Sequence, residues 1–142
     1  MAVVCFDSSA FVKLLVDEAG SDIAARLWAD ADVVVANRLA YPEVRAALAA
    51  ARRAARLDMA SERRARRDWD GFWSATRVIE LSEAIAGAAA DLVGRLVLGG
   101  ADAVHLASAL TLAEVGPVLT TWDLRLHTAA AEAGLRVAPA HL

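Results

Sequence analysis

With 142 residues, 58% of them hydrophobic, the chain is long enough to bury one core, and we expect a single domain over residues 1–142. Its formal net charge of −3 excludes a uniformly cationic nucleic-acid binder but leaves room for a local basic patch. Its single cysteine, Cys5, excludes an intramolecular disulfide framework and a cysteine-rich zinc site, which suits a cytoplasmic protein.

The N-terminal segment predicts a buried strand followed by a helix. The apolar run Ala2–Phe6 has the length and composition of a strand that is covered on both faces. Asp7 ends this run too early for a secretory signal peptide. Ser8 or Ser9 is the expected N-cap of the helix that follows.

The next segment repeats this order. Ser21 or Asp22 is the expected cap of a second helix, and Val33–Ala36 is the second buried strand. Asn37–Leu57 is predicted to be mostly helical. Because a proline restricts the residue before it, this helix either starts at Pro42 or kinks there, and the sequence leaves both alternatives open.

The middle of the chain continues the alternation. Asp58 is the expected cap of another helix, and Thr76–Leu81 is a weaker strand candidate because it contains charged residues. In the helix that follows, Asp91 and Arg95 are expected to form a favourable pair four residues apart. The longest apolar region, Ala84–Val104, is interrupted by charged residues, so no membrane span is expected.

The C-terminal third holds the remaining predicted elements. A buried helix is expected to begin at Gly100 and to stop near Gly116, followed by strand Val118–Thr121, helix Asp123–Ala133 and strand Leu135–Ala138. Short buried strands that alternate with helices predict an α/β fold of three layers, in which helices cover both faces of a short, mainly parallel sheet of four to five strands.

Several carboxylates lie at the ends of predicted strands or at the starts of predicted helices. Asp7 and Asp123 each follow a strand, so both are expected at the carboxyl edge of the sheet, where parallel sheets bind ligands. Asp102 lies in the first turn of the buried helix. Considered by itself, an aspartate at this position is explained by helix capping, because it can accept hydrogen bonds from free N–H groups and complements the positive end of the helix dipole. Glu43 lies near the start of an alanine-rich helix and could reach the same edge.

Carboxylates that converge in this way must either take up protons or hold a cation. An all-oxygen ligand set without cysteine or a histidine pair favours a hard ion, Mg²⁺ or Mn²⁺, over zinc. Such an ion commonly activates a water for attack on a phosphate. His105, one turn beyond Asp102, is expected to be a packed and hydrogen-bonded residue rather than a ligand.

Four segments carry a resemblance to a known family. Asp7-Ser-Ser-Ala-Phe-Val-Lys13, Glu43, Asp102-Ala-Val-His-Leu-Ala-Ser-Ala109 and Thr121-Trp-Asp123, in this order along the chain, resemble the PIN-domain ribonucleases, and more narrowly the VapC-type toxins. The resemblance implies a PIN-like fold and a Mg²⁺- or Mn²⁺-dependent endoribonuclease that is the toxin of a type II toxin–antitoxin pair. It also implies a homodimer that acts on RNA and is inhibited by a cognate antitoxin whose tail occupies the active-site groove.

The same resemblance assigns roles to individual residues. Asp7 and Asp102 would be the principal metal ligands, and Glu43 and Asp123 would complete the acidic pocket. Ser9 and Thr121 match hydroxyl positions that support the site in the family. The alternative function is a catalytically silent PIN-like module that binds RNA or a protein, although all four acidic positions are present. A signalling receiver or a phosphoaspartate phosphotransferase is disfavoured, because both need a lysine after a later strand and the only lysine here is Lys13.

A run of arginines lies between these motifs. Its members are Arg52, Arg53, Arg56, Arg63, Arg64, Arg66 and Arg67. A charged run of this kind is often only the solvated surface of a helical pair. Its functional interpretations are an RNA-binding surface, centred on Arg63, Arg64, Arg66 and Arg67, that attracts phosphates in a salt-dependent manner, or an arm that docks the antitoxin.

Overall fold

A parallel β-sheet forms the centre of the molecule. The computed structural model describes residues 1–142 and contains one sheet of five strands in the order β3-β2-β1-β4-β5. The strands are β1 (Val3–Phe6), β2 (Val33–Asn37), β3 (Arg77–Ile79), β4 (Val118–Thr120) and β5 (Arg136–Ala138). All neighbouring strands pair in parallel, which confirms the predicted parallel sheet.

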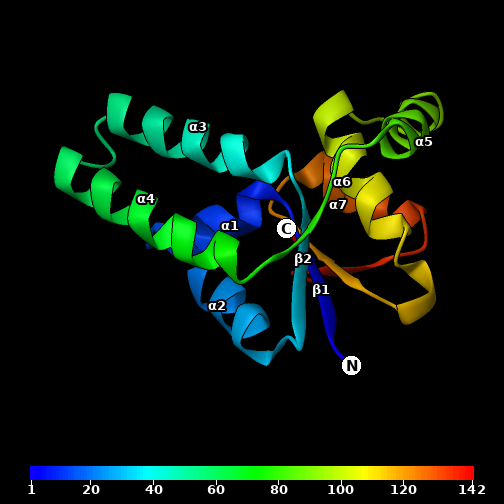
Figure 1. Cartoon of the computed structure of the whole chain (residues 1–142), viewed down its shortest axis with the longest axis horizontal. Helices are drawn as coiled ribbons and strands as arrows, with labels where there is room; N and C mark the ends of the chain where they lie inside the picture. The colour runs from blue at the N-terminus through cyan, green and yellow to red at the C-terminus, as the bar shows by residue number, and fades with distance from the viewer.

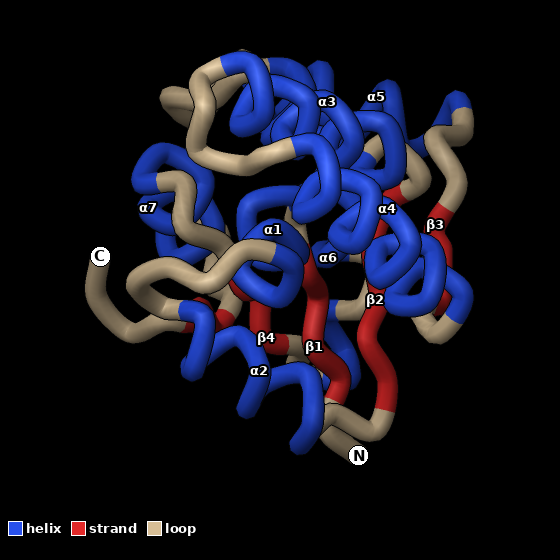
Figure 2. Tube along the Cα trace, turned by 90° about the vertical axis from the view of Figure 1, so that its left-hand side faces the viewer, coloured by secondary structure: helices blue, strands red, loops and turns tan.

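Helices cover both faces of the sheet, as Figure 1 shows. On one side lie α1 (Ser8–Leu15), α2 (Ser21–Asp30), α3 (Ala40–Arg53) and α4 (Met59–Ser74); Figure 2 views the molecule from this side. On the other side lie α5 (Glu83–Val93), α6 (Gly100–Leu110) and α7 (Leu124–Glu132), with the short 3₁₀ helix η1 (Ala113–Val115).

Strand β1 shows how the sheet divides the core. Val4 and Phe6 pack into the apolar cluster formed with α1, α3 and α4, whereas Val3 and Cys5 belong to the cluster formed with α5, α6 and α7. All four residues are buried, because alternate side chains of a strand point to opposite faces and both faces are covered. This confirms the predicted three-layer arrangement.

The strand order creates a topological switch point between β1 and β4. The chain adds β2 and β3 on one side of β1, and later adds β4 and β5 on its other side. The connections that leave β1 and β4 therefore run to different parts of the molecule, and ligands of open parallel sheets bind at such a switch point. No helix is both long enough and apolar enough to cross a membrane.

The first helix cap differs from the prediction. Asp7, not Ser8 or Ser9, is the N-cap of α1, and its Oδ1 accepts a hydrogen bond of 2.9 Å from the N–H of Ala10. Asp7 is thus the one residue between β1 and α1. Asp7 therefore both caps α1 and projects at the carboxyl edge of the sheet.

The cap of α2 also differs from the prediction. Gly20, with φ of 93°, precedes the helix and gives no side-chain cap, while the Ser21 hydroxyl donates to the carbonyl of Val16 at 2.8 Å. A Cβ at Gly20 would lie 2.7 Å from Nε1 of Trp122. The left-handed backbone and this close approach both require glycine at the position.

Two helix limits correct further expectations. Helix α3 begins at Ala40, so Pro42 does not start it; the proline lies in the first turn, where no backbone N–H is needed. Helix α5 ends at Val93, before Arg95, and no ion pair forms between Arg95 and Asp91. The residue after Val93 is Gly94, and glycine has a low helix propensity.

The turn between α3 and α4 gives a stability prediction. Ala55 has φ of 58°, and the N–H groups of Ala55 and Arg56 return to the carbonyls of Arg52 and Ala51, an arrangement that favours glycine at position 55. Ala55→Gly is expected to raise the free energy of unfolding by roughly 0.5 kcal/mol, because it relieves a left-handed alanine. Urea denaturation measures the gain, and Ala50→Gly inside α3 should instead cost about 1 kcal/mol.

Candidate functional site

Asp7 is the most deeply placed carboxylate of the predicted site. It follows β1 directly and is 3% exposed. Its Oδ1 accepts from the hydroxyl of Ser9 at 2.7 Å and from the N–H of Ala10, while its Oδ2 accepts from the hydroxyl of Thr121 at 2.5 Å. Burial raises the pKa of Asp7 above its ordinary value, although these hydrogen bonds oppose the shift.

Thr121 connects Asp7 to the segment after β4. The Thr121 hydroxyl donates to Asp7 and accepts from the backbone N–H of Asp123 at 3.0 Å. Ser9 supports the same connection, because its hydroxyl accepts from the N–H of Trp122 at 2.8 Å. The two hydroxyls expected to support the site, Ser9 and Thr121, therefore both contact Asp7 and fix where Asp123 begins α7.

Asp123 lies at the exposed rim of the site. Its Oδ1 caps α7 by accepting from the N–H of Leu126 at 3.0 Å, and its side chain is open to solvent. A carboxylate that caps a helix through one oxygen keeps the other available for a ligand or a water.

Asp102 is the carboxylate without a hydrogen-bonding partner. It lies in the first turn of α6, where its charge complements the positive end of the helix dipole, but it accepts no capping hydrogen bond, so that part of the expectation is wrong. Burial, together with the negative charges of Asp123, Asp7 and Glu43, raises its pKa to about 6. A carboxylate that lies among other negative charges and accepts no hydrogen bond from the protein is stabilised when a cation binds to it.

Glu43 reaches the site from α3 and meets a histidine. Its Oε1 lies 2.6 Å from Nε2 of His105, which is buried in α6. His105 is therefore packed and hydrogen-bonded, as predicted. Its partner, however, is one of the candidate carboxylates, which the sequence did not reveal. Hydrogen bonding to Glu43 and the nearby charges of Asp7 and Asp102 raise the pKa of His105 despite the opposing effect of burial.

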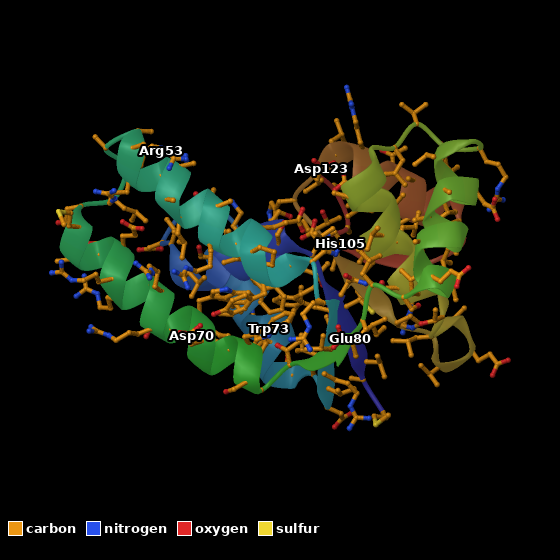
Figure 3. All side chains as sticks on the ribbon, turned by 45° about the horizontal axis from the view of Figure 1, so that its top comes forward. Arg53, Asp70, Trp73, Glu80, His105 and Asp123 are labelled. Carbon is orange, nitrogen blue, oxygen red and sulfur yellow. The ribbon has the colours of Figure 1, made fainter.

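These residues come from opposite sides of the sheet and meet at its carboxyl edge. Figure 3 places Asp123 and His105 at the junction between the helices of the two layers. The charges of Asp7, Asp123 and Glu43 all act on Asp102. No group of three or more histidine, cysteine, aspartate and glutamate side chains is arranged so that it could hold a metal ion directly.

The donor set nevertheless fits a hydrated hard cation. Mg²⁺ keeps several waters and commonly binds proteins through one or two carboxylates, so it does not need a closed cage of side chains. Asp102 has no protein donor, and Asp7 accepts only one hydrogen bond at Oδ2. These two oxygen-bearing groups have the capacity to bind such an ion, with Asp123 and Glu43 beside them.

The arginine run lies away from these carboxylates. Helices α3 and α4 are antiparallel and extend from the sheet, and Arg53 lies toward their outer end, far from Asp123 (Figure 3). Four exposed members follow one another on α4: Arg63, Arg64, Arg66 and Arg67. Arg52 is engaged in an ion pair with Glu62 at 2.6 Å. The run therefore forms a basic surface along the α3–α4 arm, from the end of α3 to the middle of α4.

Comparison with known proteins decides the family. Residues 4–132 match the PIN domain family. The chain belongs to the PIN-domain family. This confirms the resemblance carried by the motifs around Asp7, Glu43, Asp102 and Asp123.

Individual relatives of this PIN domain point to the VapC group. The chain is 54% identical over 142 residues to ribonuclease VapC45 of Mycobacterium tuberculosis, covering 100% of this chain and 99% of the relative. The crystal structure of M. tuberculosis VapC20, a toxin that cleaves the sarcin–ricin loop, is 19% identical with a TM-score of 0.65 over 93% of this chain and 95% of its own. A toxin–antitoxin complex from Klebsiella pneumoniae has a TM-score of 0.60 at 21% identity, over 84% and 86% of the two chains.

Proposed function

We propose that this PIN-domain protein is a divalent-metal-dependent endoribonuclease and the toxin of a type II toxin–antitoxin pair. Ribonuclease activity follows from membership of the family together with 54% identity to VapC45 over the whole chain. The observation that supports metal dependence is the Asp102 carboxylate, which has no protein donor and whose pKa is raised to about 6 by burial and its acidic neighbours.

The site residues divide into two roles in this proposal. Asp7 and Asp102 would hold a Mg²⁺ or Mn²⁺ ion, and Asp123 and Glu43 would orient the waters around it. A bound divalent ion supplies positive charge to the scissile phosphate and makes the attacking water more acidic. Thr121 and Ser9 keep Asp7 in place, because both hydroxyls donate to its carboxylate.

The direct test is cleavage of RNA by the purified protein. We expect end-labelled cellular RNA to be cut with Mg²⁺ or Mn²⁺ and to remain intact with EDTA. Asp7→Asn is expected to abolish cleavage, because its amide cannot supply the anionic oxygen. Cleavage by this variant at the wild-type rate would refute the assigned site. Metal-independent RNA binding without cleavage by the wild type would favour the alternative, a catalytically silent binding module.

The partners belong to the same proposal. We expect a homodimer in the cytoplasm that is held inactive by an antitoxin encoded beside it. Light scattering on the purified protein gives the oligomeric state. Expression with and without the adjacent small gene, followed by mapping of RNA ends, tests the toxin role. Growth arrest that this gene fails to relieve would contradict the toxin–antitoxin assignment.

The basic surface of the α3–α4 arm is expected to attract the RNA backbone. Replacing Arg63, Arg64, Arg66 and Arg67 together with glutamine should lower RNA affinity and flatten its dependence on salt, because fewer counterions are released. All four side chains are exposed, so the fold should persist. RNA affinities measured between 50 and 200 mM salt test this prediction. Over this range, a protein that makes many phosphate contacts typically loses about 10³-fold in affinity. An unchanged slope would mean that the arginines only solvate the arm.

A further inference from the structure

A partly buried hydrogen bond joins the two helical layers at the acidic site. Nε2 of His105, on α6, lies 2.6 Å from Oε1 of Glu43, on α3. The imidazole is 3% exposed and the glutamate side chain is 28% exposed. Because an ionised carboxylate only accepts hydrogen bonds, the histidine N–H donates. The two residues are 62 positions apart in the chain, so this contact exists only in the folded protein.

Nothing else in the structure holds the end of the Glu43 side chain. It has no ion pair with a lysine or an arginine, and His105 is its one hydrogen-bonding partner. One turn further along α3, Ala46 and Ala47 carry only methyl groups, which cannot donate a hydrogen bond to a carboxylate. A glutamate side chain that is otherwise free to rotate loses considerable entropy when it is fixed. The imidazole therefore determines where this carboxylate points.

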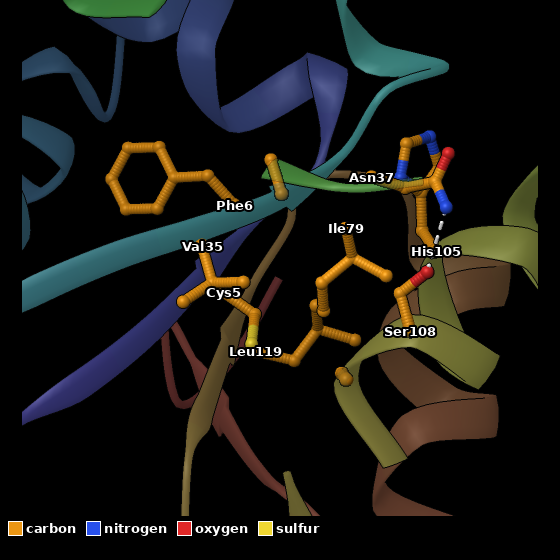
Figure 4. A pocket seen from close by; sticks show the side chains of 10 residues that line it. Cys5, Phe6, Val35, Asn37, Ile79, His105, Ser108 and Leu119 are labelled. Atoms are coloured by element: carbon orange, nitrogen blue, oxygen red, sulfur yellow. Dashed lines mark hydrogen bonds between the residues drawn. The ribbon is translucent and has the colours of Figure 1, made fainter. Parts of the chain in front are cut away.

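The helix that carries His105 is fixed to the end of β2. One turn along α6, the Ser108 hydroxyl accepts a hydrogen bond of 2.9 Å from Nδ2 of Asn37, at the end of β2, and donates to the carbonyl of Val104 at 2.8 Å. Figure 4 shows this link beside His105. Oδ1 of Asn37 accepts from the N–H of Leu39, just before α3 begins. Helix α6 is thus fixed to the connection that carries Glu43.

We propose that His105 is a positioning residue, which holds the Glu43 carboxylate at the acidic edge so that it acts together with Asp102 and Asp7 on a divalent ion. This inference rests on the proposed metal-dependent function. His105 is buried and contacts the glutamate, so it acts through Glu43 rather than on RNA. Outer partners of this kind affect metal affinity nearly as strongly as the ligands do, because they remove the freedom of the group that they orient.

Two amide substitutions separate positioning from packing. His105→Gln places an amide N–H near the location of Nε2, whereas His105→Asn is one methylene too short to reach Glu43. We expect Asn to weaken Mn²⁺ binding, measured by calorimetry, and kcat for RNA cleavage by roughly 10-fold or more. KM for RNA should change little, and Gln should restore most of both losses. In a Glu43→Ala background, His105→Asn should have no further effect on Mn²⁺ binding.

Thr76→Val is the structural control. It removes the hydrogen bond of 2.9 Å that the Thr76 hydroxyl donates to the carbonyl of Phe72, and this bond reaches no candidate carboxylate. We expect a lower melting temperature with unchanged Mn²⁺ affinity. If His105→Asn does not fold, His105→Leu, which fills the buried space, takes its place. Equal Mn²⁺ affinity for Asn, Gln and wild type would overturn the positioning role. Mn²⁺ binding without RNA cleavage by the wild type would instead overturn the proposed function.

Discussion

Asp102→Asn is expected to abolish metal-dependent RNA cleavage and, without metal, to raise the free energy of unfolding at pH 7 by about 1 kcal/mol. The carboxylate is costly in the folded state because burial and the charges of Asp123 and Asp7 raise its pKa to about 6. The half-exposed side chain is screened by water, which limits the gain to about 1 kcal/mol. The amide keeps the shape of the side chain but removes the charge that would attract the ion.

The comparison that isolates this effect uses a second aspartate on a neighbouring helix. Asp91, on α5, is exposed and forms no ion pair, so Asp91→Asn should change neither cleavage nor stability beyond about 0.5 kcal/mol. Denaturant titrations in EDTA give the stabilities, and the RNA assay gives the activities. An Asp102→Asn protein that is less stable than the wild type would show that the carboxylate contributes to folding rather than to metal binding.

The fold was largely predictable because its sheet is parallel and covered on both faces. Such strands are short apolar runs, and Val33–Ala36 and Ala2–Phe6 stand out between polar helix ends. Even the weak candidate Thr76–Leu81 contains β3, which lies at the edge of the sheet, where charged residues such as Arg77 are tolerated. The helix limits were less predictable, because packing and local turns decide them.

The candidate site was predictable in its residue types but not in its contacts. Asp7 and Asp123 could be placed at one edge because each follows a parallel strand. The bond between His105 and Glu43 joins helices on opposite sides of the sheet, and no local pattern encodes such a pair. The one available signal was the position of His105 one turn beyond Asp102. Spacing along a helix shows which residues share a face, but not which residue of another helix they meet.

The metal-free protein is expected to lose stability as the pH rises, and divalent ions should reverse this loss. The pKa of Asp102 is raised from 3.8 to about 6. Between these two pH values the unfolded chain has released the Asp102 proton while the folded protein still binds it. A rise in pH through this window therefore favours unfolding. The raised pKa of Asp7 acts in the same direction. His105, whose pKa is raised from 6.5, stabilises the folded state below that pH and loses this contribution above it.

A divalent ion that binds only the folded state should therefore help most where the carboxylates are ionised. At a concentration one hundred times its Kd, such an ion adds about 2.7 kcal/mol. Thermal melts at pH 5 and pH 7.5, with and without Mn²⁺, measure the effect, and we expect the larger rise in Tm at pH 7.5. The gain should shrink in Asp102→Asn and persist in Asp91→Asn. Because metal and protons compete for the same oxygens, a Tm gain that is equal at both pH values, or absent at both, would show that the clustered carboxylates are not the site where the ion binds.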